Sequence, residues 1–133
     1  MNLLVNIDVD DLEKATRFYV DAFGLKIGRR FSFGIELVGG PAPIYLLRKP
    51  AGTQAADATE QRRTYERHWT PIHLDFITAD IDAAVAKAVA AGARLEKSVA
   101  TYEWGKLALL SDPFGHGFCF VQFLARGYDE IAE

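Results

Sequence analysis

Hydrophobic and polar residues follow the same pattern twice along this chain. Residues 3–9 alternate between apolar and polar, an acidic pair follows, and apolar residues then recur at three- to four-residue spacing. The same order returns over residues 72–91. Alternation is typical of a half-buried strand, and the second spacing is typical of an amphipathic helix. Aligning Asp11 with Asp80 gives an offset (80 − 11) of 69 residues. The pattern therefore predicts two copies of one unit.

Both predicted helices have local signals at their ends. Asp10 or Asp11 precedes the first helix and Asp80 precedes the second, where a carboxylate can accept the free backbone N–H groups of a first turn. Gly24 and Gly92 follow the last apolar residues, as C-terminal caps do.

Short apolar runs after each helix predict three further strands in each copy, so that each unit is βαβββ. The predicted strands are 25–31, 33–38 and 44–48 in the first copy, and 94–101, 107–111 and 117–124 in the second. Asp112–Gly117 has the composition of a tight turn. We expect an α+β fold in which two pseudo-symmetric βαβββ modules form a cupped mixed sheet.

The remaining segments complete a single predicted domain over residues 1–133. Module one spans 1–49, a connector 50–70, module two 71–126 and a polar tail 127–133. Within the connector, the sequence predicts a short polar helix over Thr59–Trp69. Its arginines, Arg62, Arg63 and Arg67, would form a solvated helix face.

Composition narrows the classes of partner. The formal net charge is −3, whereas nucleic-acid surfaces are usually basic, so no nucleic-acid partner is expected. No apolar run reaches the roughly 18 residues of a membrane span, so no membrane partner is expected. Cys119 is the only cysteine, which excludes an intrachain disulfide and favours a reducing cytoplasm.

Strand alternation assigns polar residues to the concave side of the sheet. If Val5, Ile7 and Val9 face the helix, then Asn6 and Asp8 face the other side. The same parity sends His73 and Asp75 to that side, and the repeat offset pairs Asn6 with Asp75.

Three groups of residues carry a resemblance to a known family. They are Asp11–Tyr19 with Phe23–Leu25, His73–Phe76 with Asp80–Val85, and Asp112–Gly115 before the last strand. In this order they resemble the vicinal oxygen chelate superfamily, which includes glyoxalase I, extradiol dioxygenases, and the bleomycin and fosfomycin resistance proteins. The resemblance implies a cup between two modules, in which metal-dependent members hold a divalent ion.

The family's four metal-ligand positions correspond to Leu4, Tyr45, His73 and Cys119. Only His73 keeps a common ligand type, since leucine cannot ligate and neutral tyrosine ligates poorly. We therefore expect no metal and no other cofactor.

Single residues leave alternatives open. His73 has three interpretations: a hydrogen-bonded contact residue, a catalytic base, or a metal ligand. Cys119 is a buried small side chain or a reactive thiol. Trp104 lies in a turn, where an aromatic side chain can cover the core, line a pocket or join a dimer.

The preferred hypothesis is a metal-free small-molecule binding protein that works as a homodimer and takes a polar or cationic aromatic ligand in the cup. The predicted ligand-binding residues are Asn6, Tyr45, His73, Asp75, Trp104 and Cys119, with His73 as the candidate catalytic residue. The alternatives are a metal-dependent lyase, isomerase or dioxygenase of the same superfamily, and a regulatory or structural domain with a vestigial cup.

Overall fold

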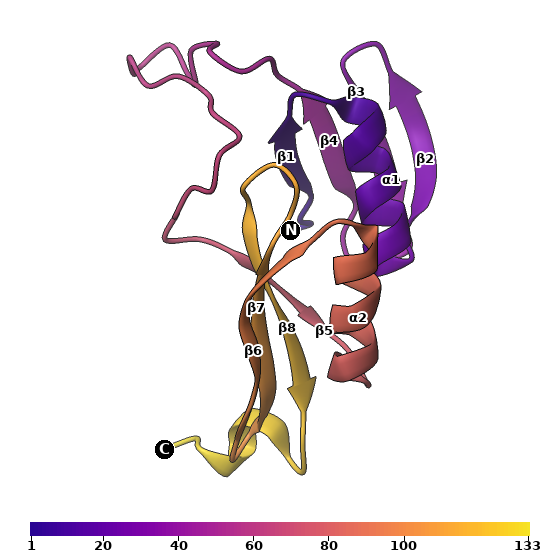
Figure 1. The fold of residues 1–133 in the computed structure, drawn as a ribbon, viewed down its shortest axis with the longest axis vertical. Coiled ribbons are helices and arrows are strands. Elements are labelled where there is room, and N and C mark those ends of the chain that lie inside the picture. The colour runs from indigo at the N-terminus through magenta and orange to yellow at the C-terminus, as the bar shows by residue number, and fades with distance from the viewer. The chain divides into compact units, whose positions relative to one another are not determined.

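The computed structural model describes residues 1–133 and divides the chain into two compact units. Unit 1 spans Met1–Glu66 and unit 2 spans Arg67–Glu133, so the boundary falls inside the predicted connector. Each unit holds one four-stranded sheet and one α-helix (Figure 1).

Unit 1 contains β1 (Val5–Val9), α1 (Leu12–Phe23), β2 (Lys26–Phe31), β3 (Gly34–Val38) and β4 (Ile44–Arg48). Its strand order is β1-β4-β3-β2, with β1 parallel to β4 and the other pairs antiparallel. Asp11 caps α1 through Lys14 N–H at 2.9 Å, and Gly24 ends it in the left-handed conformation (φ 68°). The predicted ends of this helix are confirmed.

Unit 2 repeats this order with β5 (Leu74–Ile77), α2 (Ile81–Ala91), β6 (Arg94–Tyr102), β7 (Gly105–Ser111) and β8 (Gly117–Phe123). The strand order is β5-β8-β7-β6, and β5 is parallel to β8. Asp80 and Gly92 cap α2 as Asp11 and Gly24 cap α1. The α+β fold class with two βαβββ modules is confirmed.

The helices cover one face of each sheet because the apolar residues alternate onto that face. In unit 1, Leu37 and Leu46 are fully buried, whereas Glu36 and Tyr45, their neighbours along the strands, point to the opposite face. In unit 2, the backbone N–H of Ile81 in α2 donates to the Gln122 side chain at 3.0 Å. This contact places α2 on the face to which the even-numbered residues of β8 point.

We call the face of each sheet opposite its helix the open face. In unit 2, Phe76 contacts the rings of Phe118 and Phe120 on the helix side, at centroid distances of 5.9 and 6.3 Å. Because side chains alternate along a strand, Asp75 and Cys119 lie on the open face. These two side chains therefore lie on the opposite side of the sheet from α2.

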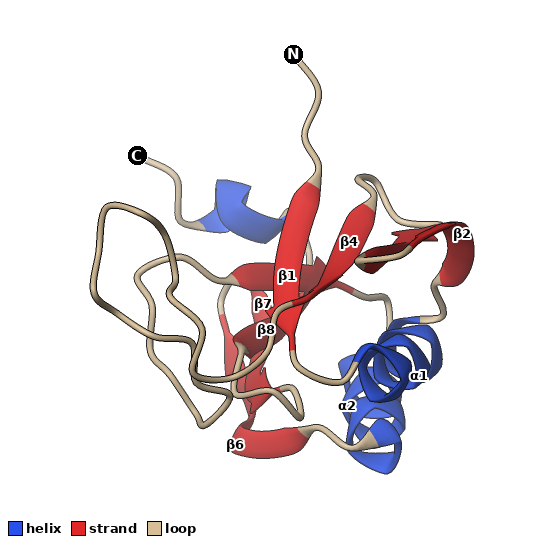
Figure 2. Cartoon of the chain, turned by 90° about the horizontal axis from the view of Figure 1, so that it is seen from above, coloured by secondary structure: helices blue, strands red, loops and turns tan.

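The connector forms no helix, which corrects the prediction over residues 59–69. It runs as irregular backbone with one isolated bridge between Gln54 and Arg62, and Figure 2 shows no helix other than α1, α2 and a short 3-10 turn over Gly127–Glu130. Its arginines are not a solvated helix face either. Arg63 Nε donates to Asp8 at 2.8 Å, and Arg67 Nε donates to Glu96 at 2.6 Å.

Neither α1 nor α2 has the length and hydrophobicity that a membrane-spanning helix needs.

Candidate functional site

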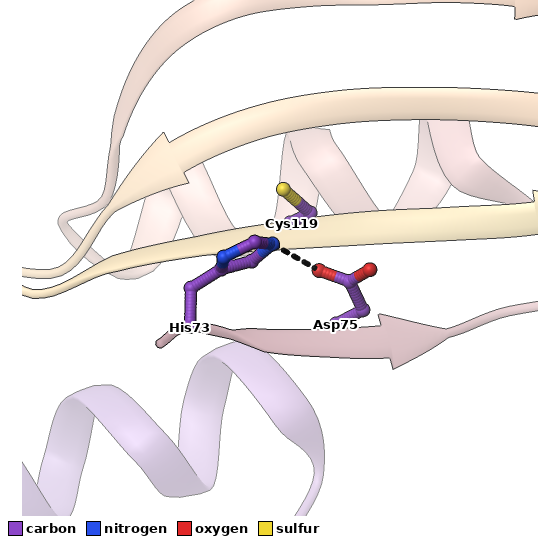
Figure 3. A group of neighbouring side chains, drawn as sticks. All are labelled: His73, Asp75 and Cys119. Atoms are coloured by element: carbon purple, nitrogen blue, oxygen red, sulfur yellow. Dashed lines mark ion pairs between the residues drawn. The ribbon is translucent and has the colours of Figure 1, made fainter. Parts of the chain in front are cut away.

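A group of three potential metal or ligand contacts lies on the open face of unit 2. His73 and Asp75 project from the start of β5, and Cys119 projects from the neighbouring strand β8 (Figure 3). One donor atom from each residue lies within 4.8 Å of the other two. The group forms because Asp75 and Cys119 are register partners in the parallel β5–β8 pair, and His73 lies two residues before Asp75 on the same face.

His73 and Asp75 are paired and accessible. His73 Nε2 lies 3.1 Å from Asp75 Oδ1, and the two side chains are 53% and 38% exposed. A carboxylate at this exposure needs only a modest loss of hydration to accept a hydrogen bond from a ligand. The pair can therefore offer a carboxylate acceptor and an imidazole ring at the same place.

Cys119 is a buried thiol. Cys119 is 5% exposed. Its burial and, to a smaller extent, the charge of Asp75 raise the pKa of the thiol to about 11. A thiol with this pKa is protonated at neutral pH and is a poor nucleophile. The buried interpretation therefore describes Cys119 better than the reactive one.

The equivalent place in unit 1 is occupied differently. Asn6 and Tyr45 are register partners in the parallel β1–β4 pair, as Asp75 and Cys119 are in the β5–β8 pair. The Tyr45 hydroxyl donates to the carboxylate of Glu36 at 2.7 Å and accepts from Arg29 Nη2 at 2.7 Å. The tyrosine hydroxyl is therefore already engaged within its own sheet.

Arg29 and Glu36 complete this network, and the sequence pattern predicts neither of them as a site residue. Arg29 donates to Glu36 through Nε at 3.0 Å and Nη2 at 2.6 Å. Hydrogen bonds from Arg29 and then from Tyr45 lower the pKa of Glu36 to about 2, and the bond to Glu36 raises the pKa of Tyr45. An irregularity in the β2–β3 register between Ile27 and Arg30 displaces Arg29 locally, which strand alternation alone does not predict.

Trp104 lies far from the His73 group within unit 2. Its ring packs on Tyr102, Phe123 and Tyr128, at centroid distances of 5.4, 6.3 and 5.0 Å. Phe123 ends β8, whereas His73 lies beside the start of that strand, about 20 Å away by the rise of six strand residues. Trp104 belongs to an aromatic cluster at the opposite end of the sheet.

Of the six predicted ligand-binding residues, the structure brings together His73, Asp75 and Cys119 in unit 2, and Asn6 with Tyr45 in unit 1. That Asn6, Tyr45, His73 and Asp75 line one pocket, with Trp104 near its rim, stays a prediction. A cavity of about 710 Å³ lies elsewhere in unit 1, between the start of α1 and the sheet, and none of the six lines it. Its walls include Leu12, Thr16, Ile27 and Arg30.

Residues 4–121 match the family model described as a glyoxalase-like domain. The chain belongs to this family. No protein with a curated description is similar enough in sequence to match it.

Solved structures of glyoxalase-like proteins have the same fold. The fosfomycin resistance protein FosX from Listeria monocytogenes has a TM-score of 0.73 at 17% identity, over 99% of this chain and 98% of that one. A glyoxalase/bleomycin resistance protein/dioxygenase family enzyme from Burkholderia phytofirmans has 0.71 at 24% identity, over 91% and 97%. Lactoylglutathione lyase from Agrobacterium tumefaciens has 0.64 at 18% identity, over 92% of each chain.

The side chains at the four family metal positions do not suit a divalent ion. Leu4 has no donor atom, and the Tyr45 hydroxyl is held by Glu36 and Arg29. Of the other two positions, His73 offers an ordinary nitrogen ligand, and Cys119 would ligate only as a thiolate. Asp75, which lies outside these positions, is the one additional donor beside His73 and Cys119.

Proposed function

We propose that this glyoxalase-like protein binds a small polar or cationic aromatic molecule, without a divalent metal, at the open face that bears His73 and Asp75. The observation that carries the proposal is the accessible Asp75 carboxylate, which is paired with a histidine rather than with a lysine or arginine. An ammonium group on the ligand would donate a hydrogen bond to Asp75, and its positive charge would offset the charge of the carboxylate. The buried, uncharged thiol of Cys119 would lie beneath the ligand.

The proposal extends to assembly and location. The protein would work as a homodimer in the cytoplasm. Sedimentation equilibrium of the purified protein tests the dimer directly.

A substitution at Asp75 tests the binding site. The Asp75→Asn change keeps the shape of the side chain and removes its charge. It should weaken binding of benzylamine by about 1–3 kcal/mol, the usual contribution of a hydrogen bond to a charged group. Isothermal titration calorimetry measures the affinity, and thermal unfolding of the free protein should be unchanged because Asp75 is outside the core.

Asp82→Asn is the matched control, because Asp82 is an exposed carboxylate on α2, away from the open face. It should leave the affinity for benzylamine unchanged. Equal affinities for the wild type and Asp75→Asn, or a protein that Asp75→Asn unfolds, would contradict the proposal.

A second function is favoured by the donor group of Figure 3. A metal-dependent lyase, isomerase or dioxygenase could hold its ion with His73, Asp75 and Cys119, since nitrogen, oxygen and sulfur donors within 4.8 Å suit a tetrahedral ion such as zinc. Elemental analysis of protein purified without chelator separates the two functions. A stoichiometric metal that is lost in His73→Ala would favour this enzyme and reject the metal-free proposal.

A further inference from the structure

Trp69 is a large aromatic residue that unit 2 holds with most of its surface in solvent. It is 72% exposed, and the guanidinium carbon of Arg67 lies 3.6 Å from the centroid of its ring. A guanidinium at this distance stacks on one face of the indole and stabilises it by a cation–π interaction. The high exposure leaves the other side of the ring accessible.

Arg67 is held in one orientation, so the guanidinium on which Trp69 stacks is fixed. Its Nε and Nη2 donate to the two carboxylate oxygens of Glu96 at 2.6 and 3.0 Å, and Nη1 donates to the carbonyl of His68. The backbone N–H of His68 donates in turn to Gly115 O at 3.1 Å. Because Arg67 and Glu96 are only 21% and 13% exposed, this bidentate pair restricts the guanidinium to one orientation.

The absence of a side chain at Gly117 allows the guanidinium of Arg67 to lie on the open face. A Cβ atom added at Gly117 would lie 2.6 Å from Arg67 Nη2, so the guanidinium lies directly over the missing side chain. Gly117 and Cys119 are two residues apart in β8 and point to the same face. Arg67 therefore lies on the face that bears Asp75 and Cys119, about 7 Å along the strand from Cys119. This is also the end of β8 beside which His73 lies.

We propose that Trp69 is the aromatic contact of the ligand site and selects planar aromatic amines. The ring of the ligand stacks on the accessible face of the indole, while an amine on a short chain donates to Asp75. Planar rings are preferred because a flat face matches the indole, whereas a puckered ring touches it only at a few atoms. This inference rests on the proposed function, because it adds a second contact to the same ligand.

The test compares two amines that differ only in the ring, which is aromatic and flat in one and saturated and puckered in the other. Phenethylamine and 2-cyclohexylethylamine have the same charge and chain length. The wild type should bind phenethylamine more tightly, by roughly three- to tenfold, the range that one aromatic pair supplies. Trp69→Leu keeps an apolar side chain and should reduce this preference to nearly one. Trp69→Phe should retain most of it.

Trp104→Phe is the matched control. The chain has two tryptophans, and Trp104 lies in the cluster at the opposite end of β8. This variant should keep the preference for phenethylamine. It also leaves Trp69 as the sole tryptophan, so phenethylamine should change the remaining fluorescence in proportion to its binding.

The outcomes separate the inference from the function on which it rests. If amines bind and Asp75→Asn weakens them, but Trp69→Leu keeps the preference for the flat ring, the inference is wrong and the proposed function stands. An unchanged Trp69 fluorescence at saturating phenethylamine also overturns it. If neither amine binds, both proposals fail. If Trp69→Leu alone abolishes the preference while the melting temperature stays the same, the inference is supported.

Discussion

The bidentate pair between Arg67 and Glu96 should stabilise unit 2 measurably, and Glu96→Gln tests this. The substitution keeps the side-chain volume and one acceptor oxygen, but it removes the charge and one of the two bonds of 2.6 and 3.0 Å. A hydrogen bond to a charged group contributes about 1.5–3 kcal/mol, and the remaining partial exposure reduces this value. We therefore expect the free energy of unfolding to fall by about 1–2 kcal/mol at pH 7.

A second ion pair of similar length is the control. Glu13 Oε1 lies 2.7 Å from Arg17 Nη1 on α1, but these side chains are 86% and 63% exposed. Exposed pairs contribute little to stability because water and salt screen them. Glu13→Gln should therefore leave the unfolding free energy nearly unchanged. Urea denaturation followed by circular dichroism measures both variants under the same conditions.

The effect of Glu96→Gln should also depend on pH. Hydrogen bonding from Arg67 lowers the pKa of Glu96 below its ordinary value of 4.5. A group whose pKa is lower in the folded state contributes stability that is complete above the unfolded pKa and is lost as pH falls through the folded one. The difference between wild type and variant should be constant near neutrality and shrink below about pH 4.5. A variant as stable as the wild type at pH 7, or a difference that grows on acidification, would refute this reasoning.

Two further predictions concern packing and thiol chemistry. Gly34→Ala should destabilise the protein by about 1–3 kcal/mol in thermal unfolding, because its Cβ would lie 2.5 Å from the backbone oxygen of Leu46, whereas Gly40→Ala, with its nearest neighbour at 3.7 Å, should have little effect. Cys119 should react with a thiol reagent such as dithionitrobenzoate far more slowly in the native protein than in urea at pH 7.5, since its thiol is buried and has a pKa of about 11. Rapid native labelling would show that the thiol is accessible.

The sequence predicted those parts of the fold whose causes are local. Asp11 and Gly24 sit one residue outside the ends of α1 because capping depends only on neighbouring backbone groups. Alternation likewise assigned Asp75 to the face opposite Phe76, because the period of a strand does not depend on its partners.

The contacts of the connector were not predictable in this way. The partner of Arg63 is Asp8, 55 residues away, and the partner of Arg67 is Glu96, 29 residues away. Periodicity contains no information on contacts between residues so far apart, so the run was interpreted as a helix. For the same reason the surroundings of Trp104 were not predictable, since nothing local indicates that its turn lies at the opposite end of β8 from His73.

The two connector arginines have a consequence for the length of the tether between the units. Arg63 is bonded to Asp8 inside unit 1, and Arg67 is bonded to Glu96 inside unit 2. Tyr65 is also held inside unit 1, since its hydroxyl donates to the carbonyl of Lys49. Only Glu66 therefore lies between the last of these unit 1 contacts and Arg67, although the sequence suggests a linker of 21 residues over 50–70. Residues added between Tyr65 and Arg67 would extend the tether while leaving these contacts intact, whereas residues added in 50–64 would enlarge a loop that already belongs to unit 1. The site for inserting a sensor domain is therefore set by the contacts of Arg63, Tyr65 and Arg67.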